Sequence, residues 1–154
     1  MNTTRLTTSE EETHAVAREL AARLTPGDVV LLSGNLGAGK TAFVRGMAAG
    51  LGIDPAEVSS PTFTLVHEYR GGRLTLYHAD LYRIDKAATE DLGLEQMGVA
   101  DGVLAIEWPE QLTHALPGAI WVTLEIGDDT SRRITIGPRP QGPGISGPSL
   151  RPEA

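Results

Sequence analysis

Residues 34–41 combine glycines, a lysine and a threonine at a spacing suited to phosphate chemistry. They match the pattern G-x-x-x-x-G-K-[ST] without a mismatch, with Gly34, Gly39, Lys40 and Thr41 at the defined positions. Glycine takes positive φ values at little cost, so such a loop can turn successive N–H groups toward phosphate oxygens. The lysine adds a mobile charge for the β- and γ-phosphates, and the threonine hydroxyl can bind Mg²⁺. The segment is therefore predicted to bind the phosphates of a nucleotide.

The segments on either side of this loop have the pattern that it requires. Residues 28–32 predict a buried strand that enters the loop. After the loop, an apolar residue recurs at i, i+3, i+4 and i+7 from Val44 to Leu51, which predicts an amphipathic helix closing at residues 50–52. The N-terminus of that helix would place partial positive charge beside the phosphates. Strand, loop and helix in this order favour a phosphate site over a chance glycine-rich turn.

Two acidic residues that end strand-like runs are candidates for the metal or the attacking water. Glu107 follows the apolar run 103–106, and Asp80 ends the run 74–79. A phosphate loop usually has an acidic partner at the end of a neighbouring strand. We assign the metal to Glu107, because its strand is the more continuously apolar, and a base or water-orienting role to Asp80. For either residue alone, a solvated strand end is the alternative.

Other polar and aromatic side chains near these motifs each allow two interpretations. The hydroxyls in segment 59–64, Thr62 among them, could reach a γ-phosphate or Mg²⁺, but the segment is equally suited to a turn before a strand. Trp108 could stack on a base or a partner, or pack as an ordinary aromatic residue. The arginines that could compensate transition-state charge, most of which we expect at the surface, are Arg45, Arg83, Arg132 and Arg133.

The sequence lacks the signatures of two alternative ligands, a zinc ion and a guanine nucleotide. His67, Glu68 and His78 lie on adjacent predicted strands, but no further ligand has a suitable spacing, so we discount a zinc site. The chain has no N-K-x-D guanine signature, which leaves adenine as the default base.

The composition of the chain limits the classes of protein to which it can belong. Its 154 residues suit one domain, and 40% hydrophobic and 21% charged residues are ordinary for a globular protein. The absence of cysteine excludes disulfides and thiolate metal sites. No stretch is apolar enough for a membrane span or signal peptide, so we expect a cytoplasmic protein without a membrane partner. A net charge of −7 argues against autonomous nucleic-acid binding.

The remaining segments predict a mixed sheet flanked by helices. Residues 1–8 suggest a leader or edge strand, and Ser9 with Glu12 forms a capping box for a helix to about residue 24. A β-hairpin is expected from residues 62–69 and 73–80, a short helix from 87–97, a central strand from 103–106, and a second hairpin from 119–126 and 132–136. The sheet should be parallel around the phosphate loop and antiparallel in the hairpins.

Residues 137–154 differ in composition from the rest of the chain. They hold five prolines and four glycines, with Ile145 and Leu150 as the large apolar residues. Such a segment buries too little apolar surface to offset the entropy of ordering it. We therefore predict a folded domain over residues 1–136 and a disordered tail over 137–154.

Taken together, five segments resemble the TsaE (also called YjeE) family. They read GNLGAGKT, SPTFTLVHEY, YHADLYRI, GLEQMG and AIEWPEQL, and the similarity runs from about Ser9 to Ile136. The resemblance implies a P-loop NTPase-type α/β domain with a mixed parallel and antiparallel sheet. It also implies an ATPase required for N6-threonylcarbamoyladenosine formation in tRNAs that read ANN codons. The implied partners are TsaD and TsaB homologues, with tRNA contacted only indirectly through them.

The resemblance also implies roles for residues at matching positions. Lys40 and Thr41 would serve ATP and Mg²⁺, Glu107 would be a ligand of Mg²⁺, and Asp80 would be essential. Further implied positions are Thr62 beside the γ-phosphate, Trp108 in activity, Glu10 and Thr13 beside adenine, and the loop residues Asn35, Leu36, Gly37, Ala38 and Gly39 around the nucleotide.

Two other functions use the same phosphate loop. A small-molecule kinase would need a lid and an acceptor pocket, usually an insertion of tens of residues that we do not find. A nucleotide-sensing module with little turnover would need no catalytic base at Asp80. Of the three functions, we expect this chain to be an ATPase that hydrolyses ATP weakly in the absence of its partners.

Overall fold

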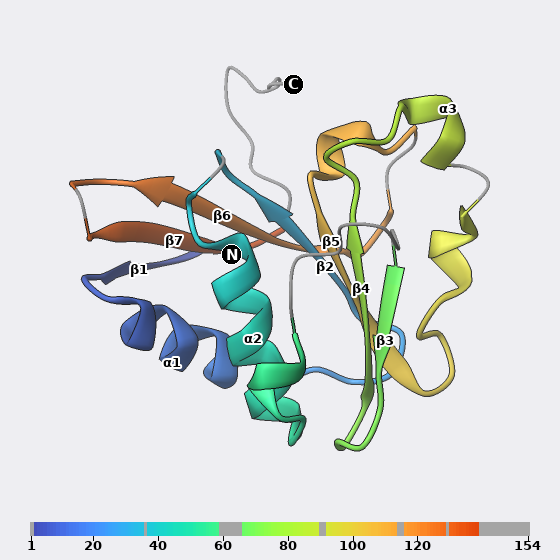
Figure 1. Cartoon of the computed structure of the whole chain (residues 1–154), viewed down its shortest axis with the longest axis horizontal. Helices are drawn as coiled ribbons and strands as arrows, with labels where there is room; N and C mark the ends of the chain where they lie inside the picture. Colours follow the sequence, from blue (N-terminus) through green and yellow to red (C-terminus); the bar gives the residue numbers. More distant parts are fainter. Residues whose placement is uncertain are drawn as a thin grey trace.

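The computed structural model describes residues 2–35, 37–58, 66–89, 92–113, 116–128 and 130–138. These residues form seven strands, three α-helices and three short 3₁₀ helices (Figure 1). In chain order the elements are β1 (Thr3–Thr7), α1 (Glu10–Ala21), β2 (Val29–Ser33), α2 (Lys40–Leu51), η1 (Pro55–Glu57), β3 (Val66–Tyr69), β4 (Thr75–Asp80), α3 (Lys86–Thr89), η3 (Leu94–Gln96), β5 (Gly102–Glu107), η4 (Pro109–Gln111), β6 (Ile120–Ile126) and β7 (Arg132–Gly137).

The strands form one mixed sheet in the order β1-β7-β6-β2-β5-β4-β3. The four central strands β6, β2, β5 and β4 are parallel, and the outer pairs are antiparallel. This arrangement confirms the expected mixed α/β sheet flanked by helices, with β5 as a fully buried central strand. The carboxyl ends of the parallel strands meet at one edge, which is where ligands bind in open α/β sheets.

Side chains alternate between two apolar clusters, one on each face of the sheet. Val30 and Leu32 of β2 point into the cluster with α1 and α2, whereas Leu31 points into the other. Figure 1 shows α1 and α2 together on one face of the sheet. The second cluster is completed by residues between β4 and β5, where Leu92, Leu94 and Met97 pack.

Two helix predictions need correction. The helix expected over 87–97 is wrong: α3 ends at Thr89, and η3 starts only at Leu94. Gly93 has φ +67°, a left-handed conformation that interrupts a right-handed helix. The first helix ends at Ala21 instead of residue 24, where the Arg73 guanidinium donates to the carbonyls of Ala21 and Leu24.

The start of α1 confirms half of the capping box. The Ser9 hydroxyl accepts a hydrogen bond from the Glu12 N–H at 3.1 Å. The Glu12 carboxylate, however, accepts from the N–H of Thr8 at 2.6 Å instead of closing on Ser9. The carboxylate thus anchors the end of β1 to the start of α1, and the predicted edge strand is confirmed as β1.

Other expectations lie partly outside the described residues. Strand β3 covers residues 66–69 of the predicted 62–69, and residues 62–65 are not described. The same holds for residues 139–154 of the predicted tail. Among the described residues, no helix is long and apolar enough to cross a membrane.

Two glycines let α1 and α2 approach closely. A Cβ at Gly46 would lie 2.7 Å from both the Ala17 Cβ and the His14 carbonyl oxygen, and one at Gly50 would lie 2.7 Å from the Ala21 Cβ. These distances are shorter than any ordinary contact between carbon atoms. The glycines and alanines therefore set the spacing of the two helices.

We expect Gly46→Val to destabilise the fold by about 1–3 kcal/mol, because the added side chain meets backbone atoms of α1 that cannot move aside. Urea denaturation would measure the change in the free energy of unfolding. The control is Glu11→Val, which places the same side chain at an exposed position of α1, where the effect should be within about 1 kcal/mol. Equal losses in the two variants would contradict close packing at Gly46.

Candidate functional site

The loop after β2 has the conformation that its glycines permit. Gly34 has φ +156° and Gly39 has φ +102°. A Cβ at Gly34 would lie 2.6 Å from the carbonyl oxygen of Leu124, so the loop rests directly on β6. Gly39 is the N-cap of α2, and its lack of a side chain leaves the first N–H groups of that helix without a side-chain cap. These groups are suited to an anion.

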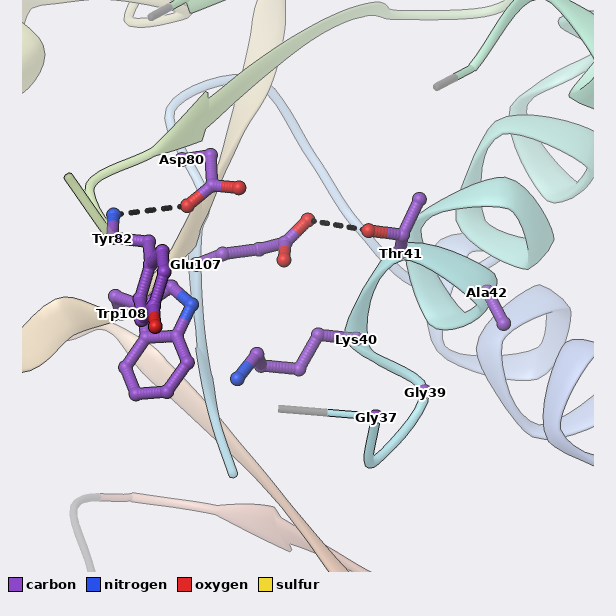
Figure 2. Close-up of a pocket in the computed structure, with 9 residues that line it drawn as sticks. All are labelled: Gly37, Gly39, Lys40, Thr41, Ala42, Asp80, Tyr82, Glu107 and Trp108. Atoms are coloured by element: carbon purple, nitrogen blue, oxygen red, sulfur yellow. Dashed lines mark hydrogen bonds between the residues drawn. The ribbon is translucent and has the colours of Figure 1, made fainter. Parts of the chain in front are cut away.

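The two predicted acidic residues are neighbours across adjacent parallel strands. Asp80 ends β4 and Glu107 ends β5, and the two are partners in the strand register. Glu107 is also the register partner of Leu32 in β2, the strand that leads into the loop. Figure 2 shows both carboxylates beside Lys40 and Thr41 at the start of α2. The structure therefore brings together the four residues that sequence reasoning selected for phosphate and metal chemistry.

Glu107 is buried, with 3% of its surface exposed, and its carboxylate needs hydrogen-bond donors. The Thr41 hydroxyl donates to Oε2 at 3.2 Å (Figure 2). The imidazole Nε2 of His78 lies 2.6 Å from the same oxygen and is the donor when the carboxylate is ionised. One carboxylate oxygen therefore joins α2, β4 and β5.

His78, which the sequence offers only as a discounted zinc ligand with His67, instead supports Glu107. Its side chain is fully buried, and no described residue bonds to its Nδ1. His67 instead lies 2.9 Å from the Tyr69 hydroxyl through its own Nδ1. The spacing H-x-D is formed by His78 and Asp80. Because a strand places residues i and i+2 on the same face, this spacing could have placed His78 beside the candidate site.

Lys40 is held against the loop and an aromatic ring. Its Nζ donates to the carbonyl of Gly34, lies 3.4 Å from that of Asn35, and lies 3.6 Å from the centroid of the Trp108 ring. Burial lowers the pKa of Lys40, whereas the nearby carboxylates of Glu107, Glu110 and Asp80 oppose that shift. The charge is thus stabilised by carbonyls, carboxylates and a π face.

Trp108 adopts a left-handed backbone conformation with φ +62°, which no other non-glycine residue in the described part of the chain has. The conformation costs about 1–3 kcal/mol. It turns the chain directly after Glu107 and sets the indole against Lys40 and Tyr82, whose ring centroid is 4.9 Å from that of Trp108. The indole therefore packs within the chain and also lines a recess beside the loop.

Asp80 has an environment that raises the pKa of its carboxyl group above the usual value. Burial raises the pKa of Asp80, and the neighbouring Glu107 carboxylate adds to the increase. The N–H of Tyr82 donates to Oδ1 at 3.0 Å and lowers the pKa, as do His78 and Lys40. A carboxylate with a raised pKa is a better proton acceptor than an ordinary aspartate.

Two recesses lie on either side of the loop and share Gly37, Gly39 and Ala42. The first has a volume of about 270 Å³ and includes Lys40, Thr41, Asp80, Tyr82, Glu107 and Trp108. The second has a volume of about 460 Å³ and includes Thr8, Ser9, Glu10, Thr13, Ala38, Thr130 and Arg132. The pair can take the two ends of one extended ligand whose middle crosses the loop.

These recesses separate the candidate residues into two groups. Lys40, Thr41, Asp80, Glu107 and Trp108 line the first, and Glu10 and Thr13 line the second with Ala38, while Gly37 and Gly39 line both. Asn35 is not among the residues that line either recess. Its carbonyl accepts a hydrogen bond from the Ala38 N–H at 3.0 Å within the loop. Leu36 and Thr62 lie outside the described residues.

We expect His78→Ala to destabilise the protein by about 1–3 kcal/mol, because the buried Glu107 carboxylate loses a hydrogen-bond donor. Chemical denaturation of His78→Ala, Glu107→Gln and the double variant would measure their coupling. The coupling energy should exceed about 0.5 kcal/mol. Additive losses would contradict the His78–Glu107 hydrogen bond.

Comparisons with known proteins match most of this chain, including the residues of the candidate site. The family model described as "Threonylcarbamoyl adenosine biosynthesis protein TsaE" matches residues 7–134. The tRNA threonylcarbamoyladenosine biosynthesis protein TsaE of Bacillus subtilis is 45% identical over 84% of this chain and 82% of its own length. That of Aquifex aeolicus is 42% identical over 83% of this chain and 90% of its own. The crystal structure of Bacillus subtilis YdiB superposes with a TM-score of 0.70 at 37% identity, covering 88% of this chain and 84% of YdiB. The chain therefore belongs to the TsaE family.

Proposed function

We propose that this chain is a Mg²⁺-dependent ATPase that serves N6-threonylcarbamoyladenosine formation in tRNAs reading ANN codons. The observation that carries the proposal is the position of Glu107, 3.2 Å from the Thr41 hydroxyl and in register with Asp80. A phosphate loop, a metal-binding pair and a proton acceptor are the parts that ATP hydrolysis needs. Membership of the TsaE family supports the role in tRNA modification.

The donor set fits a magnesium ion. Thr41 and Glu107 offer a hydroxyl and a carboxylate oxygen, and Mg²⁺ is usually held by one or two protein oxygens together with water and substrate phosphates. When bound, Mg²⁺ would neutralise charge on the β- and γ-phosphates. Thr41 and Glu107 share a hydrogen bond of 3.2 Å, which supports a role for both as ligands of the same ion.

The other residues of the first recess would act on the substrate directly. The N–H groups at the start of α2 bind phosphate oxygens, and Lys40 exchanges its carbonyl partners for the β- and γ-phosphates. Asp80 orients a water molecule and accepts its proton as the water oxygen bonds to the γ-phosphorus. The bond from phosphorus to the bridging oxygen breaks, and ADP and inorganic phosphate leave.

The second recess would hold the nucleoside. Glu10 and Thr13, the residues that the family resemblance places beside adenine, line it together with the loop residues Gly37 and Gly39. The net charge of −7 supports a division of labour in which homologues of TsaD and TsaB hold the tRNA. Phosphate release by the purified chain, alone and with TsaB, TsaD and tRNA, tests the whole proposal. A phosphorylated small molecule in place of inorganic phosphate would overturn it.

We expect Lys40→Ala to weaken ATP binding about 10- to 100-fold, because the charged hydrogen bonds to the phosphates are lost. Isothermal titration calorimetry would measure the dissociation constant. Lys86→Ala is the matched control, since Lys86 is the other lysine of the chain and is exposed. An unchanged dissociation constant in Lys40→Ala would contradict a phosphate site at this loop.

We expect Asp80→Asn to bind ATP within about threefold of the parent protein but to release phosphate about 10²- to 10⁴-fold more slowly, because the proton acceptor is lost. Single-turnover phosphate release would separate binding from hydrolysis. Asp101→Asn, an exposed position at the opposite end of β5, should leave both quantities unchanged. Turnover that survives in Asp80→Asn would favour another base.

A further inference from the structure

Arg132 contacts the phosphate loop from a strand 94 residues away in sequence. It begins β7, and its Nε donates to the carbonyl of Ala38 at 3.1 Å. One terminal nitrogen donates to the carbonyl of Gly37 at 3.3 Å, and the other donates to the carbonyl of Ser131 at 2.8 Å. The guanidinium therefore spans two consecutive peptide groups of the loop and the carbonyl of the residue that precedes its own strand.

The pattern of β7 explains how the side chain reaches the loop. Residues 132, 134 and 136 share one face of the strand, and Ile134 and Ile136 pack in the cluster beneath α1 and α2. Arg132 continues this row at the end of the strand and is half-buried, whereas Arg133 points to the opposite face and is exposed. The same geometry makes Arg132 a wall of the second recess.

These hydrogen bonds orient the peptide groups of the loop. All described peptide bonds are trans, so the C=O and N–H of each group point in opposite directions. With the Ala38 carbonyl turned toward Arg132, the N–H of Gly39 points to the other side of the loop. The preceding peptide is held at both ends, because its carbonyl bonds to Arg132 and its N–H bonds to the carbonyl of Asn35.

We propose that Arg132 is a positioning residue that holds the peptide groups of Gly37 and Ala38 in the orientation for phosphate binding. The proposal rests on the proposed nucleotide site, and it goes beyond it by assigning the loop's conformation to a side chain of β7. The guanidinium acts as a hydrogen-bond donor to backbone carbonyls, and its effect does not require contact with the phosphates.

Two substitutions separate this role from direct charge attraction. Arg132→Gln removes the charge and keeps one planar NH₂ donor group near the position of Nε, whereas Arg132→Lys keeps the charge on a single mobile ammonium group without planar donors. If Arg132 positions the loop, Arg132→Ala should weaken ADP binding about 10- to 100-fold, Arg132→Lys nearly as much, and Arg132→Gln by less than about fivefold. Calorimetry with Mg²⁺ and ADP would measure these values. The control is Arg133→Ala, which removes the same charge from the exposed face and should change binding less than twofold.

A second measurement uses the nucleotide-free protein. Amide hydrogen exchange of residues 37–40 should quicken at least tenfold in Arg132→Ala and stay near the parent rate in Arg132→Gln and Arg133→Ala. Binding that is retained in Arg132→Lys but lost in Arg132→Gln would overturn the proposal in favour of charge attraction. Unchanged exchange in Arg132→Ala, or equally faster exchange throughout the sheet, would also overturn it. Failure of the parent protein to bind ADP would count against the proposed function, while the exchange measurement would still decide the role of Arg132.

Discussion

The buried carboxylate of Glu107 imposes the main constraint on this site. A charge with 3% of its residue surface exposed must be met by donors, and the structure supplies Thr41 from α2 and His78 from β4. Satisfying one oxygen thus requires the loop helix, the central strand and its neighbour to meet at a single point. The parallel order of β2, β5 and β4 makes this possible, because it brings their carboxyl ends to the same edge.

Lys40 and Trp108 hold each other in place at the candidate site. The ammonium group is held by loop carbonyls and by the indole ring, and the indole is held in place by a left-handed residue that costs free energy. In a phosphate complex, phosphate oxygens would replace the carbonyls that now accept from Lys40.

Local patterns in the sequence predicted the residues of the candidate site better than the residues that support them. The phosphate loop, the strand ends at Asp80 and Glu107, and both hairpins depend on short-range periodicity, which a sequence displays directly. The hydrogen bond between His78 and Glu107 depends on strand order, which short-range patterns do not show. The hydrogen bond from Arg132 to the loop joins residues 94 positions apart in the sequence. The helix expected over 87–97 failed for a local reason, since apolar spacing cannot show that Gly93 takes a left-handed conformation.

The close packing of α1 on α2 connects the fold to the second recess. Gly46 and Gly50 remove the side chains that would hold the helices apart, so the start of α1 lies beside the start of α2. The second recess is therefore lined from both helices, by Glu10 and Thr13 at the start of α1 and by Gly39 and Ala42 at the start of α2. The width of that recess is therefore set by backbone contact a full turn or more away from it. Larger residues at the two glycines would push the helices apart without lining the recess, so the proposed nucleoside site can depend on residues that do not line it.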